Sequence, residues 1–248
     1  MNIGIIGGSG FYKFEMEGAQ LGQVPLVQRT DYGEVNLFAA EVGENLVYFI
    51  PRHGVAHSIA PHTINYRANI MALHELGCTD IIATNAVGSL KLMLHPGDFV
   101  IPHDYIDMTR NRYMTFFDGT GGKIVHVDQT QAYNPYLREV LISAGAGMDV
   151  QVHPSGVYIC SEGPRFETPA EIKVFAQWGA DVVGMTGIPE VVLAGELEMR
   201  YASLCVVTNY AAGVTDRAVM DSDLQAVMAD SMGSVRAMVM AVINRIPA

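Results

Sequence analysis

Residues able to make directional contacts gather in one stretch of the chain, between positions 161 and 190. Two apolar, strand-like runs flank a short amphipathic helix there. Phe166 and Glu167 follow the first run, and Met185 and Thr186 end the second. Open α/β sheets bind their ligands at the carboxyl ends of strands. The stretch therefore predicts a slot the size of a planar base beside a site for an anion.

Arg52 and His53 are further candidates for the anion site. They follow two alternating segments, 35–42 and 45–50, whose spacing predicts a hairpin around Gly43. A guanidinium offers a fork of donors and an imidazole can switch its charge, which suits an oxyanion in an otherwise acidic protein. An arginine at a strand end is also often a plain surface residue, and that alternative stays open.

Glycine-rich turns follow two other apolar runs. The first run ends at Gly7-Gly8-Ser9-Gly10, where backbone N–H groups and the Ser9 hydroxyl could hold a phosphate. A tight turn without a ligand explains the same four residues equally well. No Walker lysine is present, and no acidic residue closes a second strand about 20 residues on, which disfavours a dinucleotide-binding dehydrogenase. The second turn begins at Asn85-Ala86.

Metal or thiol chemistry is not expected. His53, His57 and His62 are close in sequence, but Pro51 and Pro61 break the helix that would align them. The three cysteines are far apart and form no CxxC pair, which fits a reducing compartment and indicates small buried hydrophobic residues. They are Cys78, Cys160 and Cys205.

Composition indicates one soluble domain spanning residues 1–248. Half of the residues are hydrophobic, and no linker or charge block divides the chain. The formal net charge of -11 argues against a nucleic-acid or membrane-surface partner. No apolar run approaches the roughly 18 residues of a membrane span, and no leader pattern is present. We therefore expect a cytoplasmic protein.

Periodicity predicts an α/β fold with a mixed, mostly parallel central sheet flanked by helices. The segment 103–128 shows no period, and irregular segments of that length are often functional. The methionines of the last helix lie on an apolar stripe and are interpreted as core. Expected strands lie at 2–6, 35–42, 45–50, 80–84, 96–102, 152–159, 181–183 and 201–208, and expected helices at 64–76, 136–143, 169–178, 189–198 and 221–245.

The order of the strand-end motifs resembles that of the trimeric purine nucleoside phosphorylases and methylthioadenosine phosphorylases over essentially the whole chain. The resemblance implies reversible phosphorolysis of a purine nucleoside by a homotrimer, with phosphate as co-substrate and no metal or organic cofactor. The motifs are GGSG at 7–10, PRHG at 51–54, NAVG at 85–88, EGPRFE at 162–167, GMTGIPE at 184–190 and TNYA at 208–211.

Motif by motif, the resemblance also implies roles for individual residues. Phosphate itself is the nucleophile, so positioning and electrostatic stabilisation would supply the catalysis. Met185 would pack against the ribose and Phe166 against the base, with Tyr210 and Ala211 nearby. The phosphate ligands would be Ser9, Arg52, His53, Asn85, Ala86 and Thr186.

The sequence departs from the adenosine-type members at the base. They carry aspartates where this chain has Asn209 and Ala211, and a small hydroxyl residue in place of Glu167. An ionised Glu167 can accept the N1–H of a 6-oxopurine, and Asn209 can donate to O6 and accept from a protonated N7. Without the resemblance, Glu167 is equally a solvated carboxylate at a helix N-terminus. The prediction is a 6-oxopurine.

The other departure concerns the 5′ end of the sugar. Phosphorylases that prefer a 5′-hydroxyl place a histidine near the start of the last helix, where this chain has Leu224 and, one turn on, Val227. Apolar side chains suit a methylthio group. His126 resembles the residue that a neighbouring subunit lends to this end. We expect 5′-methylthioinosine as substrate; inosine or guanosine, methylthioadenosine, and a non-catalytic nucleoside sensor are the alternatives.

Overall fold

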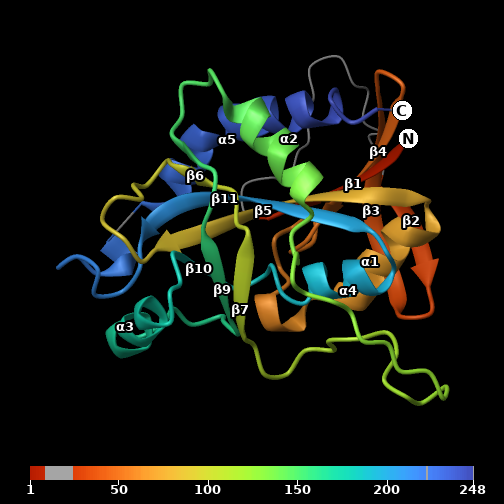
Figure 1. The fold of residues 1–248 in the computed structure, drawn as a ribbon, viewed down its shortest axis with the longest axis horizontal. Helices are drawn as coiled ribbons and strands as arrows, with labels where there is room; N and C mark the ends of the chain where they lie inside the picture. The colour runs from red at the N-terminus through yellow and green to blue at the C-terminus, as the bar shows by residue number, and fades with distance from the viewer. Residues whose placement is uncertain (9–24, 222, 248) are drawn as a thin grey trace.

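Strand β5 (Cys78–Ser89) is the centre of the sheet, because three strands pair with it (Figure 1). In the computed structural model, which describes residues 1–8, 25–221 and 223–247, β1 (Asn2–Gly7) and β11 (Arg200–Tyr210) run parallel to it. Its last two residues, Gly88 and Ser89, pair with β11 on one side and with the antiparallel β10 (Val182–Gly184) on the other. The sheet therefore branches at the carboxyl end of β5.

Three branches extend from this centre, and most pairings among the described strands are parallel. This confirms the predicted α/β fold with a mixed, mostly parallel sheet. The branches run from β1 to β4 (Asn45–Pro51), β3 (Gly33–Val42) and β2 (Leu26–Thr30), from β10 to β9 (Val157–Ser161) and β7 (Asp104–Met108), and from β11 to β6 (Phe99–Val100) and β8 (Val152–His153).

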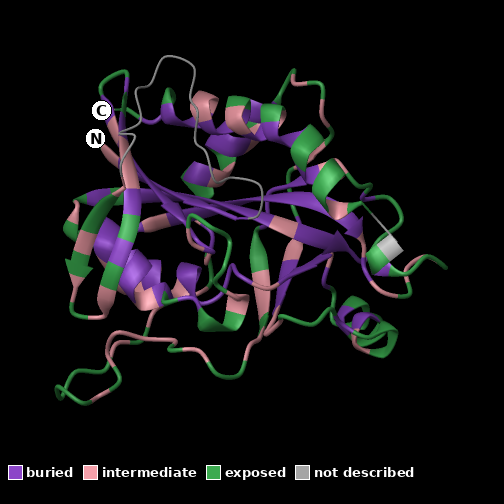
Figure 2. Ribbon diagram, turned by 180° about the vertical axis from the view of Figure 1, so that it is seen from behind, coloured by how far each residue is buried: buried purple, intermediate pink, exposed green. Residues whose placement is uncertain are grey.

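Helices cover both faces of the sheet, and the most deeply buried residues lie between the layers (Figure 2). On one face, α1 (Tyr66–Glu75) and α4 (Glu190–Glu196) pack in one apolar cluster. On the other, α2 (Pro135–Gly145) and α5 (Leu224–Ile243) pack in a second. The short α3 (Pro169–Gln177) packs against β9 and β10. Single turns of 3₁₀ helix occur at Pro61–Thr63 and Val219–Asp221.

Side-chain caps fix where several helices begin. The side chains of Asn65, Asn134 and Asp223 each accept a hydrogen bond from a backbone N–H in the first turn of the helix that follows. At α3, Thr168 and Glu171 form a reciprocal capping box. This cap holds the backbone immediately after Phe166 and Glu167.

Two of the predictions from sequence are wrong at the edge of the sheet. The predicted strand 152–159 is two short strands, β8 and β9, because Pro154 interrupts the pairing and Gly156 packs against Val100. The aperiodic segment 103–128 contains β7, whose polar residues suit an edge strand with partly exposed faces. The second error arises because both faces of β7 are partly exposed, so no buried alternation marks this strand.

Helix α5 is long and apolar enough to cross a membrane by length and composition alone. Its apolar side lies instead against α2 and the central strands, where Val235, Met238 and Val239 are completely buried. The helix is therefore part of the core.

Candidate active site

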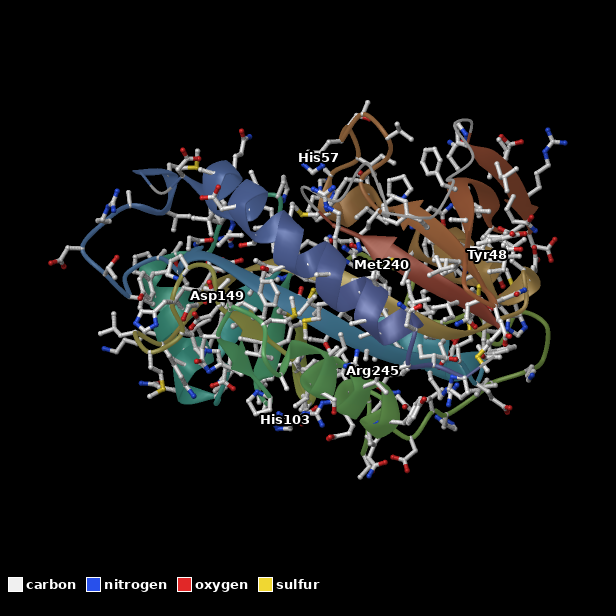
Figure 3. The ribbon with its side chains drawn as sticks, turned by 90° about the horizontal axis from the view of Figure 1, so that it is seen from above. Tyr48, His57, His103, Asp149, Met240 and Arg245 are labelled. Carbon is white, nitrogen blue, oxygen red and sulfur yellow. The ribbon has the colours of Figure 1, made fainter. Side chains whose placement is uncertain are left out.

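A cavity of about 910 Å³ lies at the carboxyl ends of β1, β4, β5, β10 and β11. Figure 3 shows α5 crossing the sheet diagonally, with His57 on the loop that rises beside it; both contribute to the wall. Parallel strands bring their carboxyl ends to one edge, which is why residues far apart in sequence meet here. The predicted site residues that line it are His53, Ala86, Phe166, Glu167, Met185, Thr186, Asn209, Ala211 and Leu224.

One end of the cavity presents Glu167 and Asn209. The Ser161 hydroxyl donates to Glu167 Oε1, and no described residue donates to Oε2. Asn209 Oδ1 accepts from Thr208 Oγ1 at 2.9 Å, and Nδ2 donates to the Tyr210 carbonyl at 2.9 Å. An amide has two donors and an oxygen with two lone pairs. Asn209 therefore keeps one donor and one acceptor for a ligand.

His53 also lines the cavity. The Nδ1 atom of this buried ring lies 2.8 Å from the Ile59 carbonyl, so Nδ1 carries the hydrogen and Nε2 is the free acceptor of the neutral ring. Burial, with smaller contributions from the neighbouring Arg52 and His57, lowers the pKa of His53 to about 4, although the hydrogen bond to the Ile59 carbonyl acts in the opposite direction. His53 is therefore neutral at pH 7.

Arg52 lies behind the cavity wall, completely buried. Its Nε and Nη2 donate to Glu190 at 2.5 and 2.9 Å, and Nη1 donates to the Thr84 carbonyl at 2.9 Å. Burial alone would lower the pKa of Arg52, but the charge and hydrogen bonds of Glu190 raise it above its ordinary value. Nη1 is 3.0 Å from where a Cβ on Gly8 would lie, so any side chain at Gly8 would crowd the guanidinium.

Thr186 is fixed by groups outside its own loop. Its Oγ1 donates to Asn85 Oδ1 at 2.8 Å, and Asn85 Nδ2 donates to Ser203 Oγ at 2.6 Å. The backbone N–H groups of Thr186 and Gly187 both donate to the Tyr158 hydroxyl at 3.1 Å. Thr186 can thus reach a ligand only through its hydroxyl.

The wall formed by α5 is mainly apolar. Leu224, Met228 and Met232 recur at every fourth position and line the cavity together with Val219. The sequence analysis assigned these methionines only to the core, although they are both buried and part of the wall. Their spacing from Leu224 was the signal that could have found them.

Other predicted residues do not line the cavity. Asn85 lies behind Thr186, and Val227 is on another side of α5 from Leu224 and Met228. The Tyr210 hydroxyl donates to the Leu92 carbonyl instead. His126 is exposed on the segment after β7 that projects past α1 and α4 in Figure 1. Ser9 falls outside the described residues.

Two residues that sequence reasoning missed hold the loops of the site: Tyr158, on β9, and Arg112, in the aperiodic segment. Nothing in their sequence neighbourhood indicates these long-range contacts. The three cysteines are buried, as predicted, and burial raises the pKa of Cys78, Cys160 and Cys205 to about 12, 11 and 12. Within the described part of the chain, no cluster of three or more His, Cys, Asp or Glu residues could hold a metal ion.

Comparison with known proteins identifies the family. The family model described as the phosphorylase superfamily matches residues 2–244. The chain belongs to the phosphorylase superfamily. A probable 6-oxopurine nucleoside phosphorylase from Dictyoglomus turgidum is 48% identical over 249 residues, covering all of this chain and 92% of that protein. A probable S-methyl-5′-thioinosine phosphorylase from Methanothermobacter thermautotrophicus is 52% identical, covering 86% of this chain and 73% of its own length.

Solved structures agree with this assignment. A mutant adenosine/methylthioadenosine phosphorylase from Schistosoma mansoni, in complex with methylthioadenosine, superposes with a TM-score of 0.90 at 32% identity. The match covers 99% of this chain and 91% of that one. The protein is thus an enzyme with the phosphorylase fold, and its cavity coincides with the strand ends where the sequence motifs of the family occur.

The Arg52–Glu190 pair makes the fold sensitive to the loss of one charge. Glu190→Gln leaves the buried guanidinium uncompensated, and we expect the free energy of unfolding to fall by about 3–5 kcal/mol. Urea denaturation at one protein concentration measures this. Glu34→Gln, in the exposed Arg29 pair, is the matched control and should cost no more than about 1 kcal/mol. Equal losses would show that the buried pair contributes no more than a surface pair.

His53 should make stability depend on pH in acid. Its pKa is about 4 in the folded protein and 6.5 when unperturbed, so the unfolded chain binds the proton first as the pH falls. The contribution of neutral His53 to the free energy of unfolding is complete above pH 6.5 and is lost as the pH falls towards 4. We expect the unfolding free energy of His53→Gln to fall less than that of the parent protein between pH 7.5 and 4.5, measured by urea denaturation. Parallel pH profiles would contradict this assignment.

Proposed function

We propose that this phosphorylase cleaves 6-oxopurine nucleosides with inorganic phosphate and prefers 5′-methylthioinosine, giving hypoxanthine and 5-methylthioribose 1-phosphate. The observation that carries the proposal is that Glu167 and Asn209 both line a cavity whose α5 wall is mainly apolar. The names of the relatives at 46–52% identity, 6-oxopurine nucleoside phosphorylase and S-methyl-5′-thioinosine phosphorylase, support the same substrate class.

Polar matching selects the base. The unpartnered Oε2 of Glu167 accepts the N1–H of hypoxanthine, whereas adenine has no hydrogen at N1. The remaining N–H of Asn209 donates to O6, and its remaining lone pair accepts from a protonated N7. When the wrong base binds, buried polar groups of such a site are left without hydrogen bonds. A site of this kind can therefore discriminate between substrates by a factor of about 10⁴ to 10⁵.

The phosphate binds near His53, Ala86 and Thr186, which line the cavity together with Gly8. An Asn side chain can present its nitrogen or its oxygen to the same neighbour, and turning the Asn85 amide frees the Thr186 hydroxyl proton for phosphate. Arg52 has one N–H left on Nη1, which lies behind Gly8 of the cavity lining. Since Glu190 balances the charge of Arg52, neutral donors provide much of the binding.

Phosphorolysis needs no protein nucleophile. A phosphate oxygen bonds to the anomeric carbon while the glycosidic bond breaks, and the bonding electron pair leaves with the purine. The hydrogen phosphate dianion loses its proton as the sugar phosphate forms, and the departing base takes up one proton at N7 through solvent. Asn209 accepts a hydrogen bond from this N7–H, and Met185 packs against the ribose. The enzyme contributes alignment and stabilisation of charge in the transition state.

The mainly apolar α5 wall selects the substituent at the 5′ position of the sugar. Leu224, Met228 and Val219 suit a methylthio substituent and would leave the 5′-hydroxyl of inosine without a partner. Inosine or guanosine is the second candidate, favoured by the relatives named only for 6-oxopurines. His126 is exposed on the projecting segment, so in this proposal it serves the site of a neighbouring subunit in a homotrimer.

Release of free base from three nucleosides tests the function. Methylthioinosine, methylthioadenosine and inosine are each incubated with and without phosphate. We expect phosphate-dependent hypoxanthine release, fastest from methylthioinosine. Faster cleavage of inosine would refute the 5′ assignment, and faster cleavage of methylthioadenosine would refute the base assignment. Binding of nucleoside without any product would indicate a sensor.

Replacing Asn209 by Asp should shift the enzyme towards 6-aminopurines. An aspartate accepts from the amino group of adenine but repels the O6 of hypoxanthine. We expect the ratio of kcat/KM for methylthioadenosine to that for methylthioinosine to rise by about 10- to 100-fold. Asn36→Asp makes the same chemical change at an exposed position of β3 and should leave the ratio unchanged. An unchanged ratio in Asn209→Asp would remove this residue from base selection.

A further inference from the structure

Arg112 lies in an irregular segment, yet its side chain is buried and forms several hydrogen bonds with the loops of the site. Its side chain is only 1% exposed. Both terminal nitrogens donate to backbone carbonyls, and Nη1 also donates to the Tyr66 hydroxyl at 3.0 Å. The carbonyl partners are Ile188 for Nη1, and Ser161 at 3.3 Å, Glu162 at 2.9 Å and Met185 at 2.8 Å for Nη2.

These carbonyls belong to two different loops. One follows β9 and leads to Phe166 and Glu167; the other, residues 185–188, follows β10 and carries Thr186. The N–H groups of Thr186 and Gly187 in the second loop already donate to the Tyr158 hydroxyl. Arg112 donates to the carbonyls of Met185 and Ile188 in the same loop, and it links that loop to the segment that leads to Glu167.

We propose that Arg112 is a positioning residue that sets the distance between the base-binding Glu167 and the phosphate-binding Thr186. Naming those two roles rests on the proposed function; the crosslink itself does not. A displacement of about 1 Å between reacting groups can cost about 10²-fold in rate, so a crosslink between the two halves of a site has a direct catalytic consequence.

A guanidinium suits this position better than any other side chain. It is planar and presents several N–H donors in fixed directions, whereas the ammonium of lysine is a compact point charge that cannot span two loops. The Glu162 carboxylate lies 3.8 Å from Nε, and the ring of Tyr66 lies 5.1 Å from the guanidinium carbon. Both offset the charge of the buried cation.

The chain offers a matched control in Arg138. This arginine also donates hydrogen bonds to two backbone carbonyls from separate segments. Its Nε donates to the Pro102 carbonyl at 2.9 Å, and its Nη2 donates to the Pro154 carbonyl at 2.8 Å. Neither carbonyl belongs to the loops of the cavity, and Arg138 does not line it. Comparing the two arginines separates a loss of activity from a general loss of structure.

The test measures kcat and KM for methylthioinosine and for phosphate in Arg112→Ala, Arg112→Lys and Arg138→Ala, together with the midpoint of urea denaturation. We expect the kcat of Arg112→Ala to be about 10²-fold lower than that of the parent enzyme. The kcat of Arg112→Lys should exceed that of Arg112→Ala by less than about 10-fold. Arg138→Ala should shift the midpoint and keep its kcat. Ethylguanidinium should restore Arg112→Ala in a saturable way, whereas ethylammonium should not.

Two results would overturn the proposal: a kcat of Arg112→Ala equal to that of Arg138→Ala, or full activity in Arg112→Lys. If Arg112→Ala does not fold, the Arg112→Lys variant tests the proposal. A reduced kcat with an unchanged denaturation midpoint supports the positioning role of Arg112, and an unchanged kcat refutes it. Absence of phosphorolysis in the parent enzyme would refute the proposed function instead. In that case, the affinities of Arg112→Lys and Arg138→Ala for hypoxanthine test the crosslink by the same comparison.

Discussion

The buried ion pair between Arg52 and Glu190 is the constraint on which the rest of the site depends. Arg52 follows β4, Glu190 begins α4, and the partners of the pair extend to β5 through the Thr84 carbonyl and to β11 through the Tyr201 hydroxyl. A charge at zero exposure is tolerable only with such complete pairing. The pair thus fixes four elements relative to one another behind the wall of the cavity.

Under the proposed function, this arrangement bears on how an acidic protein holds phosphate. The chain carries a formal net charge of -11, and the carboxylate of Glu190 neutralises the buried guanidinium of Arg52. His53 is neutral as well, and among the described residues the arginine in the cavity lining is Arg236. In that proposal much of the recognition depends on the direction of hydrogen bonds, and direction requires rigid loops. Tyr158 and Arg112 provide that rigidity, since they bind the amide and carbonyl groups of the loop that carries Thr186.

Under the proposed function, two parts of the cavity select their ligand by different physical rules. Around Glu167 and Asn209, hydrogen-bond donors and acceptors must match, so the wrong base leaves a buried polar group unpaired. Along α5, a hydroxyl beside Leu224 and Met228 would lose its hydrogen bonds to water. Selectivity for the base is therefore expected to be sharper than selectivity for the 5′ group.

The sequence by itself determined the fold class and which strand ends carry the site, because hydrophobic periodicity sets the elements and parallel strands end at a common edge. His53, Glu167 and Thr186 were found as candidates this way, Asn209 was assigned from the resemblance, and all four line the cavity. Tertiary structure alone decided the direction of the Arg52 side chain, which depends on Glu190, 138 residues away. It also decided the contacts of Arg112, whose segment has no period. Local pattern records which face of an element is buried, but it holds no information on which distant group a buried charge will meet.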